Sequence, residues 1–244
     1  MVDVYCTSSE VGRSGVSTAI VPIGSIEQHS LHLPLGTDWI LADEVGRRVA
    51  AKLHAYLLPA LPFSCSLEHS SCPGTVSLGL STFIQVIRDV ALSLHSQGIS
   101  HIAFLSWHGG NWGLKPAVRE LNLLNPGLHA IWAVPWELAQ SQLRTVFPHY
   151  DQDIHAGDVE TSCMLHLMST VVLPERVDFV PPVGREYFDY VPFARLSPTG
   201  VWGHPSLAST EKGEKALSVI VETTAAYVRE SFSSIQGFDS AGVR

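Results

Sequence analysis

Four side chains that can bind a metal ion lie close together near the start of the chain: Glu27, His29, His32 and Asp38. An apolar, strand-like run, 17–23, comes directly before them. Carboxylates together with imidazoles form the mixed ligand set that suits Zn, Mn or Fe. A loop that leaves the end of a strand is also a frequent place for the active site of an α/β protein. We therefore predict a metal site here, and a polar loop with two surface histidines is the alternative.

A second cluster follows another apolar run, 101–106, and reads His108-Gly109-Gly110-Asn111. Two glycines allow the backbone to pass close to a metal or a ligand and to adopt positive φ angles. His108 would lie at the carboxyl end of a strand, level with the first cluster. Asn111 would cap the next helix or donate a hydrogen bond to a substrate. The alternative is a turn at the start of a helix with an incidental histidine.

A third cluster surrounds the start of a predicted helix over 158–168. Glu160 would lie in the first turn, where a negative charge suits the helix dipole. His155 precedes the helix and can point into the same cavity. Glu160 could instead be the carboxylate of a capping box.

Together the clusters supply enough ligands for two metal ions that share one carboxylate. Two ions roughly 3.5–4 Å apart can lower the pKa of a water molecule between them and polarise a carbonyl group. His155 would remain to transfer a proton. These are the groups that hydrolysis of a C–N bond requires. The five candidate ligands are Glu27, His29, Asp38, His108 and Glu160.

The rest of the sequence predicts an α/β fold in one domain, 1–244, without a linker or an internal repeat. Strands and helices that alternate along the chain indicate a mostly parallel sheet covered on both faces. A segment rich in Pro and Gly, 174–205, is typical of a lid or a subunit contact. The predicted strands are 17–23, 57–62, 101–106 and 129–134, and the predicted helices are 38–54, 82–97, 113–124, 158–168 and 209–231.

The composition excludes some partners. The net charge is −8 and there is no basic run, which argues against nucleic acid or an anionic membrane as a partner. No apolar stretch reaches the roughly 18–20 residues that cross a bilayer. The N-terminus lacks the features of a signal peptide, and the four cysteines form no CxxC pair. We therefore expect a cytoplasmic protein with reduced thiols.

The clusters resemble the motifs of the creatininase (creatinine amidohydrolase) family in residue types, order and spacing. Two smaller motifs strengthen the resemblance, and all of them together extend from about residue 20 to residue 213. The matching segments are Glu27-Gln28-His29 with His32-Leu33-Pro34 and Asp38, Glu68-His69 with Pro73-Gly74-Thr75, His108-Gly109-Gly110-Asn111, His155-Ala156-Gly157 with Glu160-Thr161-Ser162, and Gly200-Val201-Trp202-Gly203-His204-Pro205.

The resemblance implies a three-layer α/β/α sandwich, two divalent metal ions per chain (Zn, Mn or Fe) and a homo-oligomer, commonly a hexamer. It implies that Asp38 bridges the two ions, with Glu27 and His108 completing one site and His29 and Glu160 the other. His155 would be the acid/base group beside them. The residues that we expect to contact the substrate are His32, Glu68, His69, Asn111 and Trp202.

The resemblance also implies an amidohydrolase that acts on a small-molecule amide. Creatininase proper carries a carboxylate two residues after the histidine that corresponds to His108, and this chain has Gly110 there. The wider family includes deformylases of formamidopyrimidine nucleotides and a peptidase that trims the mycofactocin precursor, so both activities are alternatives. Arg185 and Arg195 do not form a clear phosphate clamp. A non-catalytic metal-bearing scaffold would require a broken ligand set, whereas all five ligands and His155 are present.

Overall fold

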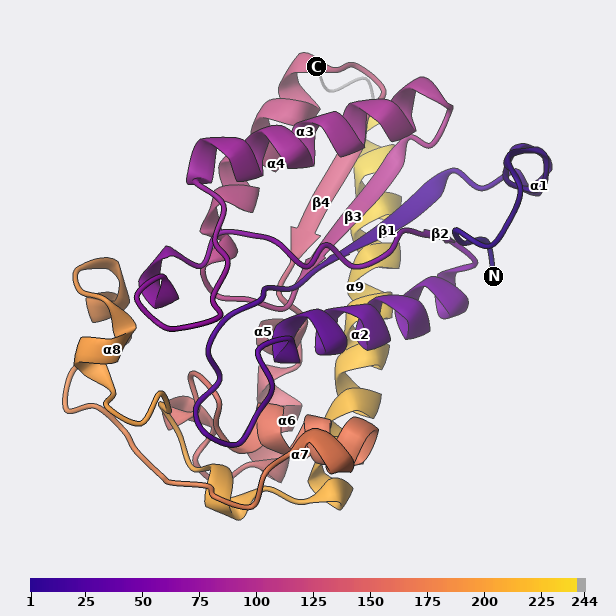
Figure 1. Cartoon of the computed structure of the whole chain (residues 1–244). Coiled ribbons are helices and arrows are strands. Elements are labelled where there is room, and N and C mark those ends of the chain that lie inside the picture. The colour runs from indigo at the N-terminus through magenta and orange to yellow at the C-terminus, as the bar shows by residue number, and fades with distance from the viewer. Residues whose placement is uncertain (241–244) are drawn as a thin grey trace.

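A four-stranded parallel sheet forms the centre of the protein, in a computed structural model that describes residues 1–240 (Figure 1). The last four residues of the predicted domain, 241–244, lie outside the described residues. The strands are arranged in the order β2-β1-β3-β4. Their bounds are Thr18–Ile23 for β1, Tyr56–Leu57 for β2, His101–Ser106 for β3 and His129–Ala133 for β4.

Five longer helices surround this sheet: α2 (Thr37–Leu53), α3 (Leu80–Ser96), α4 (Leu114–Leu124), α7 (Asp158–Met168) and α9 (Thr210–Ser240). Short helices fill the connections: α1 (Ser8–Ser14), α5 (Pro135–Leu138), α6 (Gln140–Val146) and α8 (Phe193–Leu196). The 3₁₀ turns are η1 (Leu67–His69), η2 (Asn111–Gly113), η3 (Tyr150–Gln152), η4 (Ser169–Val171), η5 (Arg185–Asp189) and η6 (Pro205–Leu207).

Successive residues of the strands alternate between two apolar cores, because side chains of a strand point to opposite faces of the sheet. In β3, Ala103 and Leu105 join the core with α2, α7 and α9, whereas Ile102 and Phe104 join the core with α3 and α4. Figure 1 shows α3 and α4 on one side of the sheet and α2 and α9 on the other. The predicted three-layer α/β/α sandwich is therefore confirmed.

Two predicted elements have different lengths in the structure. The strand predicted over 57–62 is reduced to β2, because Pro59 and Pro62 have no N–H group for the ladder. The last helix continues beyond the predicted 209–231 to Ser240, because Phe232 and Ile235 still pack into the core. The segment 174–205 contains the 3₁₀ turn η5 and the short helix α8.

The order of the strands reverses at β1, which has β2 on one side and β3 on the other. In open parallel sheets, ligands bind in the crevice beyond the carboxyl ends of the strands at such a reversal. Glu27 follows β1 and His108 follows β3, so the topology brings two of the clusters to this crevice.

The helices α7 and α9 pack closely where Gly213 meets the backbone of Ser162. A Cβ at Gly213 would collide with the carbonyl group of Ser162, which is part of the backbone and cannot swing away. We expect Gly213→Ala to lower the free energy of unfolding by about 1–3 kcal/mol, the usual cost of overpacking. Thermal unfolding measures this change. Gly237→Ala in the same helix is the control, because nothing lies within 4 Å of its new Cβ, and it should be neutral or stabilising. Equal melting temperatures for the two variants would contradict the prediction.

Among residues 1–240, no helix combines the length and the apolar character that crossing a membrane requires. The four cysteines are free thiols, as expected, and Cys65 and Cys72 do not form a disulfide.

Candidate metal centre

The loop after β1 turns back against the start of α2, and this turn places Asp38. A Cβ at Gly24 would collide with the backbone of Trp39, so only glycine allows the close approach. The hydroxyl of Ser25 donates a hydrogen bond of 2.8 Å to Asp38 Oδ2. Asp38 lies in the first turn of α2 and is buried, with its carboxylate directed at the other clusters.

The two oxygens of Asp38 each face a different histidine. Oδ1 lies 3.2 Å from Nε2 of His29, and Oδ2 lies 3.2 Å from Nδ1 of His108. Glu27 Oε2 lies 3.2 Å from the same atom of His108, and Glu160 Oε2 lies 3.8 Å from Nε2 of His29. Asp38 is therefore shared by two sets of donors, Glu27–Asp38–His108 and His29–Asp38–Glu160, and the donor atoms within each set are at most 4.8 Å apart.

Backbone carbonyl groups fix which ring nitrogen of each histidine faces the carboxylates. His29 Nδ1 is 3.2 Å from the carbonyl oxygen of Glu27, and His108 Nε2 is 3.0 Å from that of Cys65. Because a carbonyl only accepts hydrogen bonds, each of these nitrogens carries the hydrogen in the neutral ring. The nitrogen that faces Asp38 then offers a lone pair, which is the arrangement that a metal ligand needs.

The buried carboxylates of the cluster are stabilised by positive charge on the neighbouring histidines. Both carboxylate oxygens of Glu27 are buried without a hydrogen-bond partner. Burial alone would raise the pKa of Asp38, but His29 and the hydrogen bonds from both histidines lower the pKa to about 2. Burial likewise opposes charge on His108, yet Glu27 and Asp38 raise the pKa of that ring well above its usual range. Without a metal ion the two rings are therefore protonated, and a divalent cation would take the place of the protons that face the carboxylates.

A bend before α7 brings its first turn to the centre. Ala156 has φ = 50°, a left-handed conformation that is unfavourable for a residue with a side chain. Its N–H donates a hydrogen bond of 2.7 Å to Glu160 Oε2, which holds this carboxylate toward His29. The backbone groups of Trp202 pair with those of His155 on the other side of the bend.

His155 lies beside the centre with Nδ1 3.8 Å from Glu27 Oε1. Its Nε2 is 2.9 Å from the carbonyl oxygen of Gln28, so Nε2 carries the hydrogen and Nδ1 offers a lone pair to the site. Burial, and then the nearby His29 and His69, hold the pKa of His155 well below its usual range. His155 is therefore neutral, and its Nδ1 carries no proton. The donor atoms of Glu27, His29 and His155 also lie within 4.8 Å of one another, so geometry alone allows it to be a ligand as well.

Gln28 has a role that the sequence did not indicate. Its side-chain nitrogen donates to His69 Nδ1 at 3.0 Å, its backbone carbonyl accepts from His155 Nε2 at 2.9 Å, and its Oε1 accepts a hydrogen bond from the N–H of Ser30. Gln28 therefore holds two rings of the site from a position between two candidate ligands. In the sequence, only its position between Glu27 and His29 could have indicated this role.

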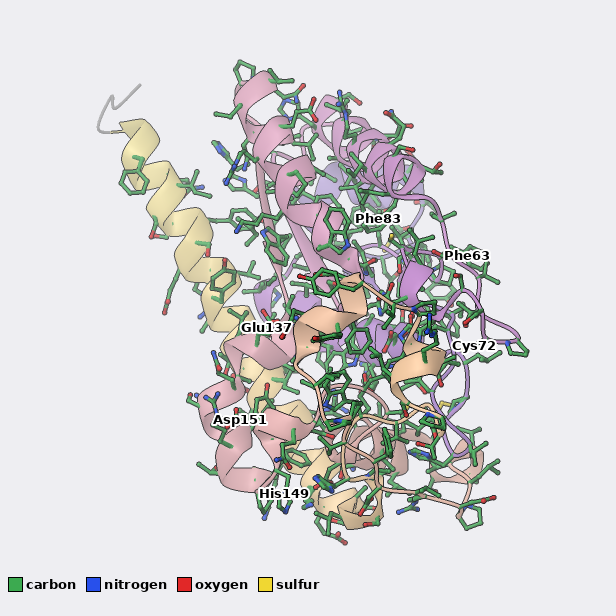
Figure 2. All side chains as sticks on the ribbon, turned by 90° about the vertical axis from the view of Figure 1, so that its left-hand side faces the viewer. Phe63, Cys72, Phe83, Glu137, His149 and Asp151 are labelled. Carbon is green, nitrogen blue, oxygen red and sulfur yellow. The ribbon has the colours of Figure 1, made fainter. Side chains whose placement is uncertain are left out.

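Two cavities meet at the centre. One has a volume of about 820 Å³ and includes Glu68 and His69 in its lining, and the other has a volume of about 260 Å³ and is lined by Trp107 and Trp136. Glu27, His108 and His155 are shared by both. Figure 2 looks onto the side of the molecule where Glu137 and Asp151, residues of the smaller cavity, are labelled.

Three of the residues expected to contact substrate line neither cavity. His32 Nε2 forms a hydrogen bond of 2.9 Å with the hydroxyl of Thr161. The amide of Asn111 accepts from the N–H of Cys65 and donates to the hydroxyl of Ser106. Trp202 is buried and stacks on Phe188, with ring centroids 5.3 Å apart. For these three residues, contact with substrate stays a prediction.

The segment 174–205 lies over this region. In Figure 2 it crosses the face turned toward the viewer. Phe188 stacks on Phe193 with ring centroids 4.9 Å apart, and Phe193 packs edge-on against His69 and His155. The segment thus encloses the histidine side of the site with aromatic rings.

The comparisons with known proteins agree with this geometry. The family model described as creatinine amidohydrolase matches residues 5–228. The mycofactocin precursor peptide peptidase of Mycobacterium ulcerans (strain Agy99) is 31% identical over 88% of this chain and 86% of its own. The creatinine amidohydrolase of Pseudomonas putida is 29% identical over 90% of this chain and 91% of its own.

Solved structures show the same relationship. A structure described as the Mn form of creatininase has a TM-score of 0.83 and 28% identity, and the match covers 95% of this chain and 98% of that one. The match of the family model to most of the chain shows the relationship directly. The chain therefore belongs to the creatininase family of hydrolases.

Proposed function

We propose that this protein is a metal-dependent amidohydrolase with two divalent metal ions at one centre, where it cleaves the C–N bond of an amide. The observation that carries the proposal is Asp38, whose two oxygens each face one histidine of a separate donor set. Glu27 and His108 would complete one site, and His29 and Glu160 the other. The mixed nitrogen and oxygen donors suit Zn, Mn or Fe, and a relative in this family is described as the Mn form.

The residues around the centre would divide the work. The bound ions would polarise the amide carbonyl and lower the pKa of a water molecule. His155, neutral and with Nδ1 toward the site, would accept the proton of the attacking water. The water oxygen bonds to the carbonyl carbon, the C–N bond breaks, and His155 passes the proton to the leaving nitrogen. Gln28 keeps the ring in position through its carbonyl oxygen.

Peptide hydrolysis is the second candidate within the same chemistry. Both cavities reach Glu27 and His108, so an amide with groups on both sides of the C–N bond has space on each side. A relative 31% identical is a peptide peptidase. Deformylation of a nucleotide has less support, because the arginines lining these cavities are Arg144 and Arg185, and Arg144 is paired with Asp151.

The proposal is tested by metal content and turnover together. The purified protein is loaded with Zn, Mn or Fe, its metal is measured by elemental analysis, and a panel of linear amides, cyclic amides and dipeptides is assayed with and without a chelator. We expect about two ions per chain and hydrolysis that the chelator abolishes. A metal-loaded protein that cleaves none of the panel would favour the non-catalytic scaffold, and hydrolysis that survives chelation would exclude the proposed centre.

Creatinine should be a poor substrate. A side chain at position 110 would collide with the carbonyl oxygen of Cys65 and with Glu68, so the centre has no room for the carboxylate that creatininase carries there. The charge and the shape of the pocket beside His108 therefore differ. We expect a kcat/KM for creatinine below about 10⁴ M⁻¹s⁻¹, the lower end for a committed enzyme. A higher value for the Mn- or Zn-loaded protein would contradict this expectation.

A further inference from the structure

Arg185 lies where the two cavities meet. It is part of the lining of both cavities, together with Glu27, His108 and His155. A group bound next to Arg185 would therefore be adjacent to the centre whichever cavity holds the rest of the ligand. Arg185 begins η5, in the segment that lies over the site.

The guanidinium group of Arg185 is close to the centre. A Cβ built on Gly109 would lie 3.0 Å from Arg185 Nη2, so the guanidinium rests against the backbone directly after His108. The absence of a side chain at Gly109 leaves room for this approach. A ligand group that pairs with Arg185 would then lie beside the backbone that carries His108 into the centre.

The charge of Arg185 has no acidic partner among the described residues within 4 Å. The other arginine of the smaller cavity, Arg144, forms an ion pair of 2.8 Å with Asp151. The side chain of Arg185 is exposed at the mouth of the site. An arginine without a partner at the mouth of an otherwise acidic site is available to a ligand.

We propose that Arg185 binds a carboxylate of the substrate, so that the preferred substrates are amides with a carboxylate one or two carbon atoms from the scissile group, as in N-acyl amino acids. A guanidinium matches a carboxylate with two parallel hydrogen bonds. A phosphate dianion is a poorer match, because Glu186 and Asp189 line the same cavity and would repel the higher charge. The inference rests on the proposed amidohydrolase activity and adds the class of substrate.

The experiment compares two matched pairs of ligands, hippurate with hippuramide and N-acetylglycine with N-acetylglycinamide. The two members of each pair differ in one group only, a carboxylate in the first and an uncharged carboxamide in the second. Equilibrium binding to the metal-loaded protein is measured by calorimetry, and hydrolysis is followed separately by release of glycine or glycinamide. Because a carboxylate can also bind a metal directly, the decisive measurement is the effect of Arg185→Ala on the preference within each pair.

We expect the wild-type protein to bind at least one carboxylate about tenfold more tightly than its amide, the effect of one charge-assisted hydrogen-bonded pair. Arg185→Ala should remove this preference, and Arg185→Lys should retain part of it. Arg195→Ala is the matched control, because Arg195 is an exposed arginine of the same segment that lines neither cavity. The control should behave as the wild type.

Three results would overturn the inference. These are the absence of any preference within both pairs, a preference that persists in Arg185→Ala, and tighter binding of the phosphonate analogue of hippurate than of hippurate itself. Hydrolysis without a preference for carboxylates would uphold the amidohydrolase and reject the role of Arg185. Binding that depends on Arg185 without any hydrolysis would uphold the role of Arg185 and reject the amidohydrolase.

Discussion

Asp38→Ala should lose both metal ions and all hydrolytic activity. Each oxygen of Asp38 faces a different histidine at 3.2 Å, so the substitution removes one ligand from both donor sets at once. The remaining pairs, Glu27–His108 and His29–Glu160, offer two protein ligands per ion, fewer than the three that catalytic zinc sites usually have. Elemental analysis of the purified variant should find close to none of the roughly two ions expected for the wild type.

The control for this variant lies in the same helix. Asp43→Ala removes a carboxylate from α2 at a position outside both donor sets and should retain the wild-type metal content. Of the two sets that share Asp38, Glu27→Ala removes a ligand from one only, so this variant should retain about one ion. If Asp38→Ala still bound about two ions per chain, Asp38 would not be the bridging ligand.

His155→Ala should retain the metal ions and lose most of kcat. General acid–base catalysis by one side chain is typically worth about 10²–10⁴-fold in rate, and we expect kcat to decrease by a factor in that range. The expectation follows from the position of Nδ1 toward Glu27 and from the neutral state of the buried ring. Steady-state kinetics and elemental analysis of the same preparation measure both quantities.

The alternative role of His155 gives a different result. The donor atom of His155 lies within 4.8 Å of those of Glu27 and His29, a set that could also bind an ion. Loss of metal from His155→Ala would show that the residue is a ligand and would reject its role in proton transfer. His149→Ala, a histidine outside these donor sets, is the control for the loss of an imidazole.

Much of the fold was predictable because its sequence signals are local. The strands β1, β3 and β4 are short apolar runs, and α2, α3, α4 and α7 begin and end within two residues of their predicted bounds. The short helices α1, α5 and α6 were not predicted, since a helix of four to seven residues contains too few turns for a periodic pattern. The length of α9 depends on tertiary packing of Phe232 and Ile235, which the local sequence does not reveal.

The site was predictable to the extent that its residues belong to dense motifs. The five candidate ligands and His155 were chosen from three clusters, and the structure brings these clusters together at the reversal of strand order. The contributions of Gln28 and Arg185 depend on the path of the chain through space. Whether the amide of Asn111 pairs with Cys65 and Ser106 or points into the cavity could not be decided from its position in a motif.

The sharing of Asp38 between two donor sets has a consequence for the folding of the chain. The ligands come from the loop after β1, the start of α2, the end of β3 and the start of α7, so ions bound at this point would act as a cross-link that closes two long loops of the polypeptide. Cross-links of this kind reduce the conformational entropy of the unfolded chain, and the benefit increases with loop length. A cation that binds only the folded form also stabilises it in proportion to the logarithm of its concentration. The resistance of this protein to unfolding would then depend on the supply of metal in the cell, and a shortage would expose the chain to proteolysis as well as halting its chemistry.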